Sequence, residues 1–455
     1  MKLINDTIVA IATPHGYGGI SIIRISGNKI FCLIEKIVKK KLYSRISSYC
    51  FFYDLNDVCI DKGIVVFFKA PNSFTGENVL EFHCHGGVII VNILLKIILS
   101  FDIRLAFPGE FSFRAFFNNK IDLIQAESIS HLIFSKTEKS VLSINKSLNG
   151  LFSGHIRMIL NDVFFLRMHI ESHIDFLDEN ISLLKKEEFI YDISKLLKNL
   201  DILIQNISDS KNISYGLNVA ILGNANSGKS TLMNLLAKEQ VSIVDKDPGT
   251  TRDIIKFFIV INGIKFNLID TAGIRITENR VEQEGIKKSI QAALNSDLLL
   301  LIIDILIYKN HNINYIYNKL FNFVNLNKNN HLILLNKCDL IIKKFYNNFK
   351  MYNNFIFFSA KTGYGLNKLK KLILKKCNYI NNDDTIFFVN NRNLFNINLA
   401  KNCLKNCYNY LQNDFFYDLL AEDLKSTQKF LMEIVGEGVN ECFLDLIFSE
   451  FCIGK

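Results

Sequence analysis

Apolar residues in the first 119 positions occur in short runs that are separated by turn residues. Ile20–Ile25 and Ile64–Phe68 are two such runs, each bounded by Gly or Pro, and both are predicted to be β-strands. Val88–Ile98 is apolar but interrupted by two polar residues, which is typical of an amphipathic helix. Residues 1–119 are therefore predicted to form a mixed α+β domain.

The pattern becomes helical over residues 120–214, where apolar side chains recur every three or four positions and Gly and Pro are almost absent. A second helical pattern runs from residue 394 to residue 447, within a region that we bound at 379–455. The predicted buried stripes are Leu123, Ala126, Ile129, Leu132 and Ile133; Leu160, Val163, Phe164, Leu166 and Ile170; and Leu404, Tyr408, Leu411, Leu419, Leu420 and Leu424.

Between these helical regions, residues 215–378 alternate strand and helix patterns. Ile255–Ile261 and Ile264–Ile269 are separated only by Asn-Gly, which predicts a hairpin with a type I′ turn. Leu298–Ile307 is too short to span a bilayer and is predicted to be a buried strand. The simplest architecture is a multidomain α/β protein in which an inserted domain, 215–378, interrupts a helical domain formed by 120–214 and 379–455.

A phosphate-binding loop marks the start of the inserted domain. Gly223–Ser230 reads Gly-Asn-Ala-Asn-Ser-Gly-Lys-Ser, follows the apolar run Leu217–Leu222 and precedes a helical pattern. Strand, glycine-bounded loop and helix are the context that a P-loop requires. Loop amides and the helix N-terminus bind phosphate oxygens, and Lys229 adds a positive charge that also serves catalysis.

Residues that can hold Mg²⁺ follow in order. Asp270 leaves the second hairpin strand in Asp-Thr-Ala-Gly, and Gly273 lets the backbone approach the γ-phosphate. Ser230 supplies a hydroxyl ligand to the same ion. Thr250 and Thr251 lie in a turn-rich stretch, where a Thr can complete the metal shell with triphosphate and release it after hydrolysis.

Two later motifs identify the base as guanine. Asn336-Lys337-Cys-Asp339 follows a strand, and the Asp339 carboxylate can accept two N–H bonds from an edge that adenine lacks. Such bonds contribute about 1.5–3 kcal/mol each, so guanine is favoured at least tenfold to a hundredfold. The backbone of Ser359-Ala-Lys361 can bond the guanine O6.

Five elements in this order predict a Ras-like P-loop GTPase domain that converts GTP to GDP and phosphate. Ile274 stands where many GTPases have a Gln that orients the attacking water, so another group must do so; Glu282 and Glu284 are the candidates. The predicted GTP-binding positions are Asn226, Ser227, Gly228, Lys229, Ser230, Thr231, Asp245, Lys246, Asp247, Pro248, Gly249, Thr250, Thr251, Asp270, Thr271, Ala272, Gly273, Asn336, Lys337, Asp339, Ser359, Ala360 and Lys361.

The amino-acid composition adds little to these predictions. The 455 residues carry a net charge of +9, which permits a polyanionic partner such as RNA, but the chain is also rich in Lys, Asn, Ile and Phe, as codon bias would make it. Ten scattered Cys without a CxxC pair, and the absence of a secretory leader, predict a cytoplasmic protein with reduced thiols. His83-Cys84-His85 could suggest zinc, but a turn with a structural His85 is favoured because no second ligand cluster is evident.

The chain also resembles the MnmE (TrmE) family along essentially its whole length. Beyond the GTPase motifs, the matching segments are Asp6–Ala10, Ile23–Gly27, Pro71–Glu77, His85–Gly87, Phe107–Glu127 and the terminal Phe451–Lys455. The resemblance implies a GTPase that modifies the wobble uridine of certain tRNAs. It also implies that 1–119 is a tetrahydrofolate-binding domain through which the protein forms a homodimer.

The resemblance implies specific ligands. A 5-formyl- or 5,10-methylene-tetrahydrofolate would be bound by Arg24, Glu81, Lys120 and Lys455; cations suit folate carboxylates and a carboxylate suits the amino-pyrimidine edge of the pterin. K⁺ beside the phosphates would replace an arginine finger, with Asn226, Asp245, Asp247 and Thr250 as ligands. Mg²⁺ would be bound by Ser230 and Thr251, and Glu282, rather than Glu284, would be catalytic.

The implied chemistry is shared with the flavoprotein MnmG in a heterotetramer. A one-carbon unit and glycine or ammonium would become a (carboxymethyl)aminomethyl group at C5 of the wobble uridine. Cys452 matches a cysteine of the family, and its role stays open between a nucleophile and a packing residue. The alternative hypothesis is a ribosome-associated GTPase switch without modification chemistry.

Overall fold

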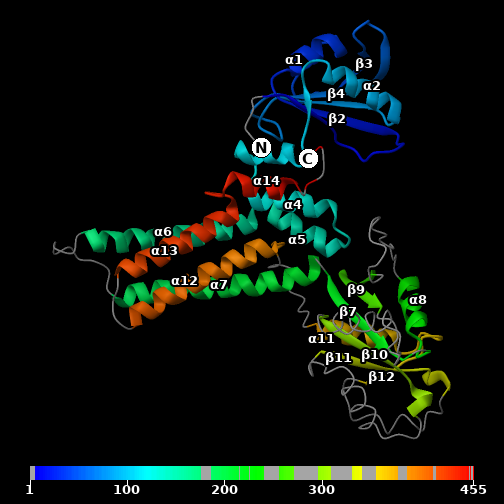
Figure 1. Ribbon diagram of the computed structural model, residues 1–455, viewed down its shortest axis with the longest axis vertical. Helices are drawn as coiled ribbons and strands as arrows, with labels where there is room; N and C mark the ends of the chain where they lie inside the picture. Colours follow the sequence, from blue (N-terminus) through cyan, green and yellow to red (C-terminus); the bar gives the residue numbers. More distant parts are fainter. Residues whose placement is uncertain are drawn as a thin grey trace, which may run out of the picture. The chain divides into compact units, whose positions relative to one another are not determined.

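The computed structural model divides into two compact units, which Figure 1 shows with their elements labelled. The first unit contains Met1–Phe134, Asn145–Leu203 and Val389–Lys455, and the second contains Ser135–Ile144 and Ile204–Phe388. The residues that the structure describes are 6–175, 186–214, 216–224, 226–239, 256–270, 296–308, 330–340, 355–377, 387–412, 417–449, 451 and 454.

A six-stranded sheet with the order β3-β4-β5-β2-β1-β6 forms the N-terminal part of the first unit. All neighbouring pairs are antiparallel except β1 and β6. Helix α2 (Val88–Leu99) buries Val91, Leu94 and Ile98 in the same cluster as Ile23 and Ile25 of the sheet, which confirms the predicted amphipathic helix. The other elements are β1 (Ile8–Ile11), β2 (Ile20–Ser26), α1 (Ile30–Leu33), a π-helical turn (Ile34–Val38), β3 (Ser48–Tyr53), β4 (Cys59–Phe68), β5 (Val79–His85), β6 (Arg104–Leu105) and α3 (Glu110–Phe117).

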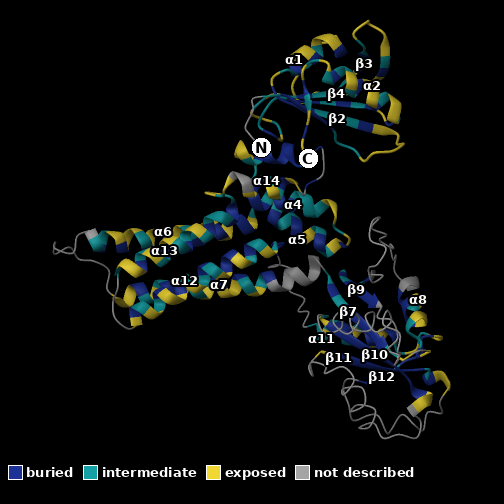
Figure 2. Cartoon of the chain, viewed as in Figure 1, coloured by how far each residue is buried: buried dark blue, intermediate teal, exposed yellow. Residues whose placement is uncertain are grey.

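Long helices make up the rest of this unit, as the sequence predicts. Helix α13 packs along both α6 and α12, and the colours of Figure 2 show that these helices have both buried and exposed residues along their length. Helix α4 begins with a capping box, in which the side chains of Asp122 and Gln125 each bond the other's backbone N–H. The helices are α4 (Leu123–Ile133), α5 (Glu138–Leu148), α6 (Leu151–Asp175), α7 (Lys186–Ser214), α12 (Asn391–Gln412), α13 (Tyr417–Val435) and α14 (Glu441–Ser449).

Several members of the predicted stripes were assigned to the wrong helical face. Phe164 and Leu419 are 49% and 45% exposed, Ile133 is also exposed, and Ile129, Leu132, Leu160 and Tyr408 are half-buried. The buried face of α6 runs through Ile156, Ile159, Val163, Leu166 and Ile170. Its neighbours in sequence point about 100° away, so apolar character alone did not identify the buried positions.

The C-terminal helix α14 packs closely on α3. Gly109, just before α3, has φ +69°, and a Cβ there would lie 2.3 Å from the carbonyl oxygen of Phe448. Phe113, Phe448 and Phe451 form an aromatic cluster at this contact. Only glycine fits both the left-handed backbone and the contact, so the chain end is tied to the segment that follows the N-terminal sheet.

A buried ion pair joins α4 to the segment that re-enters the first unit. The guanidinium of Arg392 donates to Glu127 Oε1 at 3.1 Å and to the carbonyl oxygen of Glu433 at 2.8 Å, and Asn393 donates to Glu127 Oε2 at 3.2 Å. Burial raises the pKa of Glu127, although Arg392 and Asn393 oppose that shift. The buried carboxylate of Glu127 is therefore bonded by Arg392 and Asn393, the second and third residues of α12.

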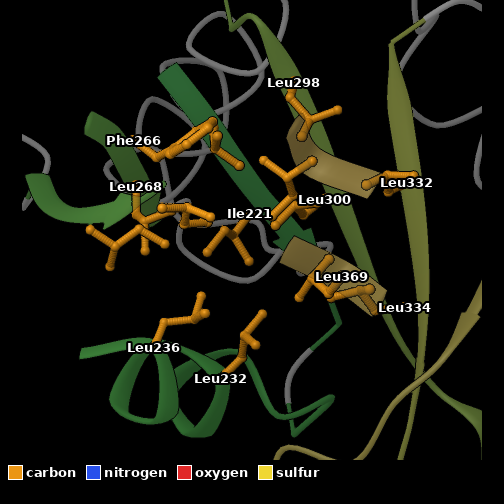
Figure 3. Close-up of a cluster of buried hydrophobic side chains, with 14 of the residues drawn as sticks. Ile221, Leu232, Leu236, Phe266, Leu268, Leu298, Leu300, Leu332, Leu334 and Leu369 are labelled. Carbon is orange, nitrogen blue, oxygen red and sulfur yellow. The ribbon is translucent and has the colours of Figure 1, made fainter. Parts of the chain in front are cut away.

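The second unit is built on a sheet with the order β12-β11-β10-β7-β9-β8. Only β8 and β9 are antiparallel. Figure 3 shows the core, where Leu232 and Leu236 of α8 point toward strand residues such as Ile221. The elements are β7 (Leu217–Gly223), α8 (Lys229–Glu239), β8 (Lys256–Ile261), β9 (Ile264–Asp270), β10 (Leu298–Asp304), a 3₁₀ turn (Ile305–Tyr308), β11 (His331–Asn336), a 3₁₀ turn (Cys338–Leu340), β12 (Phe355–Phe357) and α11 (Leu366–Lys376).

The predicted hairpin is confirmed. Strands β8 and β9 pair from Lys256–Ile269 to Ile261–Ile264, and Asn262 and Gly263 have φ of +51° and +79°, as a type I′ turn requires. The predicted strand at Leu298–Ile307 is shorter than expected: it ends at Asp304 and continues as a 3₁₀ turn.

Replacement of Arg392 by Ala should lower the free energy of unfolding by about 3–5 kcal/mol, because it leaves the Glu127 carboxylate buried without its cation. The folded variant would hold Glu127 protonated, with a pKa above that of the unfolded chain. Its stability is therefore retained at low pH and lost as the pH rises, so the deficit relative to wild type grows with pH. Urea unfolding followed by helical circular dichroism measures it.

The matched control is Glu171→Ala, which breaks the more exposed Arg167–Glu171 pair of α6 and should cost no more than about 0.5 kcal/mol. Equal losses in the two variants, or a loss in Arg392→Ala that does not vary with pH, would contradict a buried counter-charge at Glu127.

Candidate functional site: a guanine-nucleotide site and a polar site on the N-terminal sheet

Four parallel strands bring the predicted nucleotide-binding segments to one edge of the second sheet. Gly223 at the end of β7 is in register with Ile302 of β10, and Asp304 at the end of β10 is opposite Asn336 at the end of β11. Because the carboxyl ends of parallel strands meet at the same edge, the loops that follow them lie together, as in other open α/β sheets.

The P-loop accepts only glycine at two of its positions. A Cβ on Gly223 would lie 2.4 Å from the carbonyl oxygen of Ile302, and one on Gly228 would lie 2.1 Å from Asn336 Nδ2. Asn226 is in the left-handed region with φ +60°. Lys229 begins α8 and donates from Nζ to the carbonyl oxygens of Gly223 at 2.6 Å and Asn224 at 3.0 Å. The backbone carbonyls of the loop thus bind the Lys229 ammonium. The loop leads into the N-terminus of α8, where backbone N–H groups can bind phosphate.

Asn336 holds the phosphate loop and the base loop together. Its Nδ2 donates to the carbonyl oxygen of Ser227 at 2.7 Å, and its Oδ1 accepts from the N–H of Ala360 at 2.9 Å. Asn336 is buried, and so are Ser227, Ser359 and Ala360. The backbone of Ser359-Ala360-Lys361 is predicted to bond guanine O6; within it, the Ala360 N–H donates to the side chain of Asn336.

The neighbours of Asn336 present charge at the same edge. Lys337 has φ +64° and donates from Nζ to Asp304 Oδ2 at 2.5 Å. The N–H of Cys338 donates to the carbonyl oxygen of Phe358, which fixes the turn, and Asp339 in that turn is exposed. The chain is thus arranged to hold a carboxylate in solvent, where the edge of a base can reach it.

The Mg²⁺ and K⁺ assignments are only partly within the described residues. Ser230 and Thr231 are exposed in the first turn of α8, and Asp270 ends β9 with its backbone in register with Ile221. The predicted site residues that lie outside the described part of the chain are Asp245, Lys246, Asp247, Pro248, Gly249, Thr250, Thr251, Thr271, Ala272, Gly273, Glu282, Cys452 and Lys455.

On the N-terminal sheet, the structure places Arg24 directly beside Glu81. The two residues are opposite each other in the β2–β5 pair, and Arg24 Nε donates to Glu81 Oε1 at 2.7 Å. The guanidinium also donates to the carbonyl oxygen of Gly454 at 3.3 Å and lies 6.0 Å from the ring centroids of Phe74 and Phe111. Arg24 therefore bonds both Glu81 and a residue near the end of the given sequence.

Lys120 is placed differently. It is exposed, and it lines a cavity of about 360 Å³ together with Gln125, Arg157 and Glu437, but Arg24 and Glu81 do not line this cavity. Its Cε lies 3.3 Å from the position that a Cβ on Gly76 would take. The loop that carries Gly76 also carries Phe74, so it lies between the Arg24 pair and Lys120.

A buried network that sequence reasoning did not assign positions this loop. Arg114 is 6% exposed and donates to Asp6 Oδ1 at 2.7 Å, Glu77 Oε2 at 3.0 Å and Glu110 Oε1 at 3.0 Å. Burial disfavours ionisation of Glu110, but hydrogen bonds from Arg104, the Phe107 N–H and Arg114 outweigh it and lower its pKa. The available signal was the Glu110–Arg114 spacing of one helical turn; its partners are remote in sequence.

His85 bonds Asp61, which agrees with the structural role that was favoured for it. Its Nδ1 lies 2.7 Å from Asp61 Oδ1, and its backbone N–H donates to Asp61 Oδ2 at 2.9 Å. These bonds outweigh burial and lower the pKa of Asp61. Within the described ranges, no three His, Cys, Asp or Glu side chains gather as metal ligands would, and no helix there is both long and apolar enough to cross a bilayer.

Comparison with known proteins identifies the family. The family model described as the N-terminus of the GTP-binding protein TrmE matches residues 7–120, and that of the MnmE helical domain matches residues 123–452. The tRNA modification GTPase MnmE of Francisella tularensis subsp. novicida is 38% identical over 459 aligned residues, covering 99% of both chains. The chain belongs to the MnmE family of tRNA modification GTPases.

Another curated relative and several solved structures are also similar to parts or all of this chain. MnmE of Francisella philomiragia is 37% identical with the same coverage. Among solved structures, the G domain of T. maritima FeoB matches 35% of this chain and 98% of its own length, at 23% identity and a TM-score of 0.28. Aquifex aeolicus Era bound to GDP and AlF₄⁻ matches 41% and 66%, at 24% identity and a TM-score of 0.28. Membership of the MnmE family makes the chain a GTP hydrolase that acts in tRNA modification.

Replacement of Asp339 by Asn should exchange the preferred base. A side-chain amide donates to the 2-oxo group of xanthine, whereas the carboxylate accepts from the 2-amino group of guanine, so GTP affinity should fall by about a hundredfold while affinity for xanthosine triphosphate rises. Competition against a fluorescent GTP analogue measures both affinities. Asp339→Ala is the control and should lose GTP without gaining the xanthine nucleotide; an Asn variant that still prefers GTP contradicts the assignment.

Proposed function

We propose that the protein is a K⁺-dependent GTPase that works with the flavoprotein MnmG. Together they would add a (carboxymethyl)aminomethyl group to C5 of the wobble uridine of certain tRNAs, with a tetrahydrofolate derivative as the one-carbon source. Family membership supports the GTPase and the tRNA substrate class. The folate, K⁺ and partner assignments depend on the residues discussed next.

The observation that carries the folate assignment is that Arg24 donates to both Glu81 and the carbonyl oxygen of Gly454. The residues present fit such a ligand. Glu81 is 14% exposed; Arg24 bonds its Oε1, and its Oε2, which lies 3.3 Å from His83 Nε2, has the capacity to accept a further hydrogen bond from an amino-pyrimidine edge. Arg24 is cationic and lies between two aromatic rings, which suits a flat, anionic molecule.

When bound, the folate would supply the one-carbon unit. The residues of this chain would bind and orient it: Arg24 and Lys120 through charge, and Glu81 through hydrogen bonds. Lys455 is assigned to the same site by resemblance and follows Gly454, whose position against Ile11 leaves no room for a Cβ. The bond from Arg24 to the carbonyl oxygen of Gly454 supports a ligand role for the residue that follows.

The K⁺ assignment is based on Asn226. Its left-handed backbone and exposed side chain set an amide oxygen at the surface of the P-loop, and oxygen atoms are the ligands that alkali ions prefer. Asp245, Asp247 and Thr250 would complete the shell, Ser230 and Thr251 would hold Mg²⁺, and Glu282 would orient the attacking water. K⁺ would then stabilise the charge that develops on the phosphates, as an arginine finger does elsewhere.

Exposed apolar side chains on the N-terminal sheet support the proposed homodimer. Strand β3 lies at the sheet edge, and its Tyr49 and Phe51 are 58% and 49% exposed; Ile64 of β4 and Ile20 of β2 are also exposed. Apolar residues gathered on one region in this way are typical of association surfaces. The partners would be a second copy of this chain and, in the cytoplasm, MnmG.

The test of the whole proposal is nucleoside analysis of tRNA from cells that lack this gene. The wobble modification should be absent, and the wild-type chain should restore it. Glu81→Gln should not restore it, because the neutral amide pairs poorly with both Arg24 and the pterin, although its GTP hydrolysis should stay normal. Glu35→Gln, the same change at an exposed carboxylate in the π-helical turn of the same domain, is the control and should restore it.

Unchanged nucleosides together with a ribosome-assembly defect would instead favour the ribosome-associated switch. Loss of restoration in both Glu81→Gln and Glu35→Gln would show a folding defect and remove the support for a folate role of Glu81.

GTP turnover should increase by about tenfold or more when Na⁺ is replaced by K⁺, because K⁺ supplies charge at the phosphates. Asn226→Gly removes the side-chain oxygen but tolerates the left-handed backbone, so it should abolish the difference between the ions without weakening GTP binding. Asn224→Ala is the matched control in the same loop and should keep the K⁺ response. Equal rates in Na⁺ and K⁺ for the wild-type chain would show the assignment of Asn226 to be wrong.

A further inference from the structure

Helix α11 of the second unit carries a high concentration of positive charge. Its 11 residues include five lysines and no carboxylate, whereas Lys and Arg together make up 53 of the 455 residues of the chain. The general richness in lysine therefore does not account for this helix, and its charge needs a separate explanation. The five are Lys368, Lys370, Lys371, Lys375 and Lys376.

Three of these lysines form a row on the surface of the domain. Lys368, Lys371 and Lys375 are exposed and follow one another at three- and four-residue spacing, so they lie on one face of the helix. We call them the lysine stripe. The buried face of α11 belongs to the main hydrophobic cluster of the second unit and lies nearly opposite, since successive residues are turned by about 100°. Its members are Leu366, Leu369 and Ile373.

The stability of the helix does not explain the lysine stripe. Lys375 is favourable in the last turn, at the negative end of the helix dipole, but Lys368 lies in the first turn, at the positive end. Lys371 is three residues from Lys368 and four from Lys375, and like charges at these spacings repel each other. Within the part of the chain that the structure describes, no carboxylate forms an ion pair with any of the three. The stripe is therefore suited to an anionic partner.

The lysine stripe runs away from the edge of the sheet that holds the guanine-binding motifs. Helix α11 begins beside the end of β12, where a Cβ on Gly365 would lie 2.4 Å from the carbonyl oxygen of Phe357. It ends near the start of β11, where burial and then the charge of Lys376 lower the pKa of His331. The stripe spans roughly 10 Å along the helix axis, which is enough for about three consecutive phosphates of a nucleic-acid strand.

We propose that the lysine stripe binds the phosphate backbone of the tRNA on which the protein acts. Contacts of this kind position an RNA without reading its sequence. The protein belongs to a family that acts on tRNA, whose backbone is a regular row of negative charges. A membrane surface fits less well, because the apolar face that would enter it is buried in the domain. The inference needs only the tRNA substrate class and is independent of folate, K⁺ and MnmG.

The salt dependence of tRNA binding by the full chain tests the proposal, because each phosphate contact releases counterions. The probe is a fluorescent tRNA transcript with uridine at the wobble position, and its anisotropy is measured with GDP and Mg²⁺ present. Lys368→Gln/Lys371→Gln/Lys375→Gln should weaken binding by about tenfold or more at low salt. It should also make the slope of log affinity against log salt shallower by about two to three. Lys371→Gln alone should give about a third of this change in slope.

The matched control removes the same charge from three exposed helical lysines that each have a carboxylate three or four residues away. It is Lys195→Gln/Lys198→Gln/Lys429→Gln, and it should keep the wild-type slope. GTP hydrolysis without tRNA should stay within about twofold of wild type in both triple variants. Thermal unfolding should show the α11 variant to be at least as stable as wild type, since like-charge pairs are removed.

The proposal is overturned if the wild-type chain shows no salt-dependent binding of the transcript, or if the folded α11 variant keeps the wild-type slope. Equal changes in the two triple variants would also overturn it, because they would show an effect of net charge alone. If the α11 variant binds tRNA normally but no longer binds vesicles that contain phosphatidylserine, the lysine stripe belongs to a membrane contact instead.

Discussion

The hydrogen bonds of the Asn336 side chain are the contacts on which the nucleotide site depends. One amide group bonds a carbonyl of the phosphate loop and an N–H of the base loop, which are 109 and 24 residues away in sequence. The space is so limited that Gly228 cannot carry a side chain. Because the group is buried, an unmatched donor or acceptor here costs its full desolvation, and both loops are held to one separation. A nucleotide that contacts both loops must therefore fit the distance between them.

In the first unit, buried charged side chains hold remote segments together, as the amide of Asn336 does in the nucleotide site. Arg114 bonds carboxylates from three separate segments, and Arg392 bonds Glu127 together with a carbonyl at the end of α13. Ion pairs of this kind contribute little net stability compared with apolar side chains of similar volume, but losing one partner is costly. They therefore determine which segments are in contact. The Arg114 network holds the loop that carries Phe74 and Gly76 against α3, and the Arg392–Glu127 pair holds the start of α12 against α4. The Arg114 network lies next to residues with proposed roles, and the Arg392–Glu127 pair lies where the chain returns from the second unit.

Local patterns in the sequence were sufficient for most elements, while contacts between remote segments were not. The Asn262-Gly263 turn was predictable because both residues favour positive φ and the flanking runs alternate. Phe164 and Leu419 were misplaced because a neighbouring residue in the same helix is equally apolar, and only packing against α13 or α12 decides between them. In the candidate site, the roles of Asp339 and Lys229 are predictions from motif chemistry. The bonds of Asn336 to the phosphate and base loops, and those of Arg114 to three carboxylates, could not be predicted from motifs, because their partners are remote in sequence.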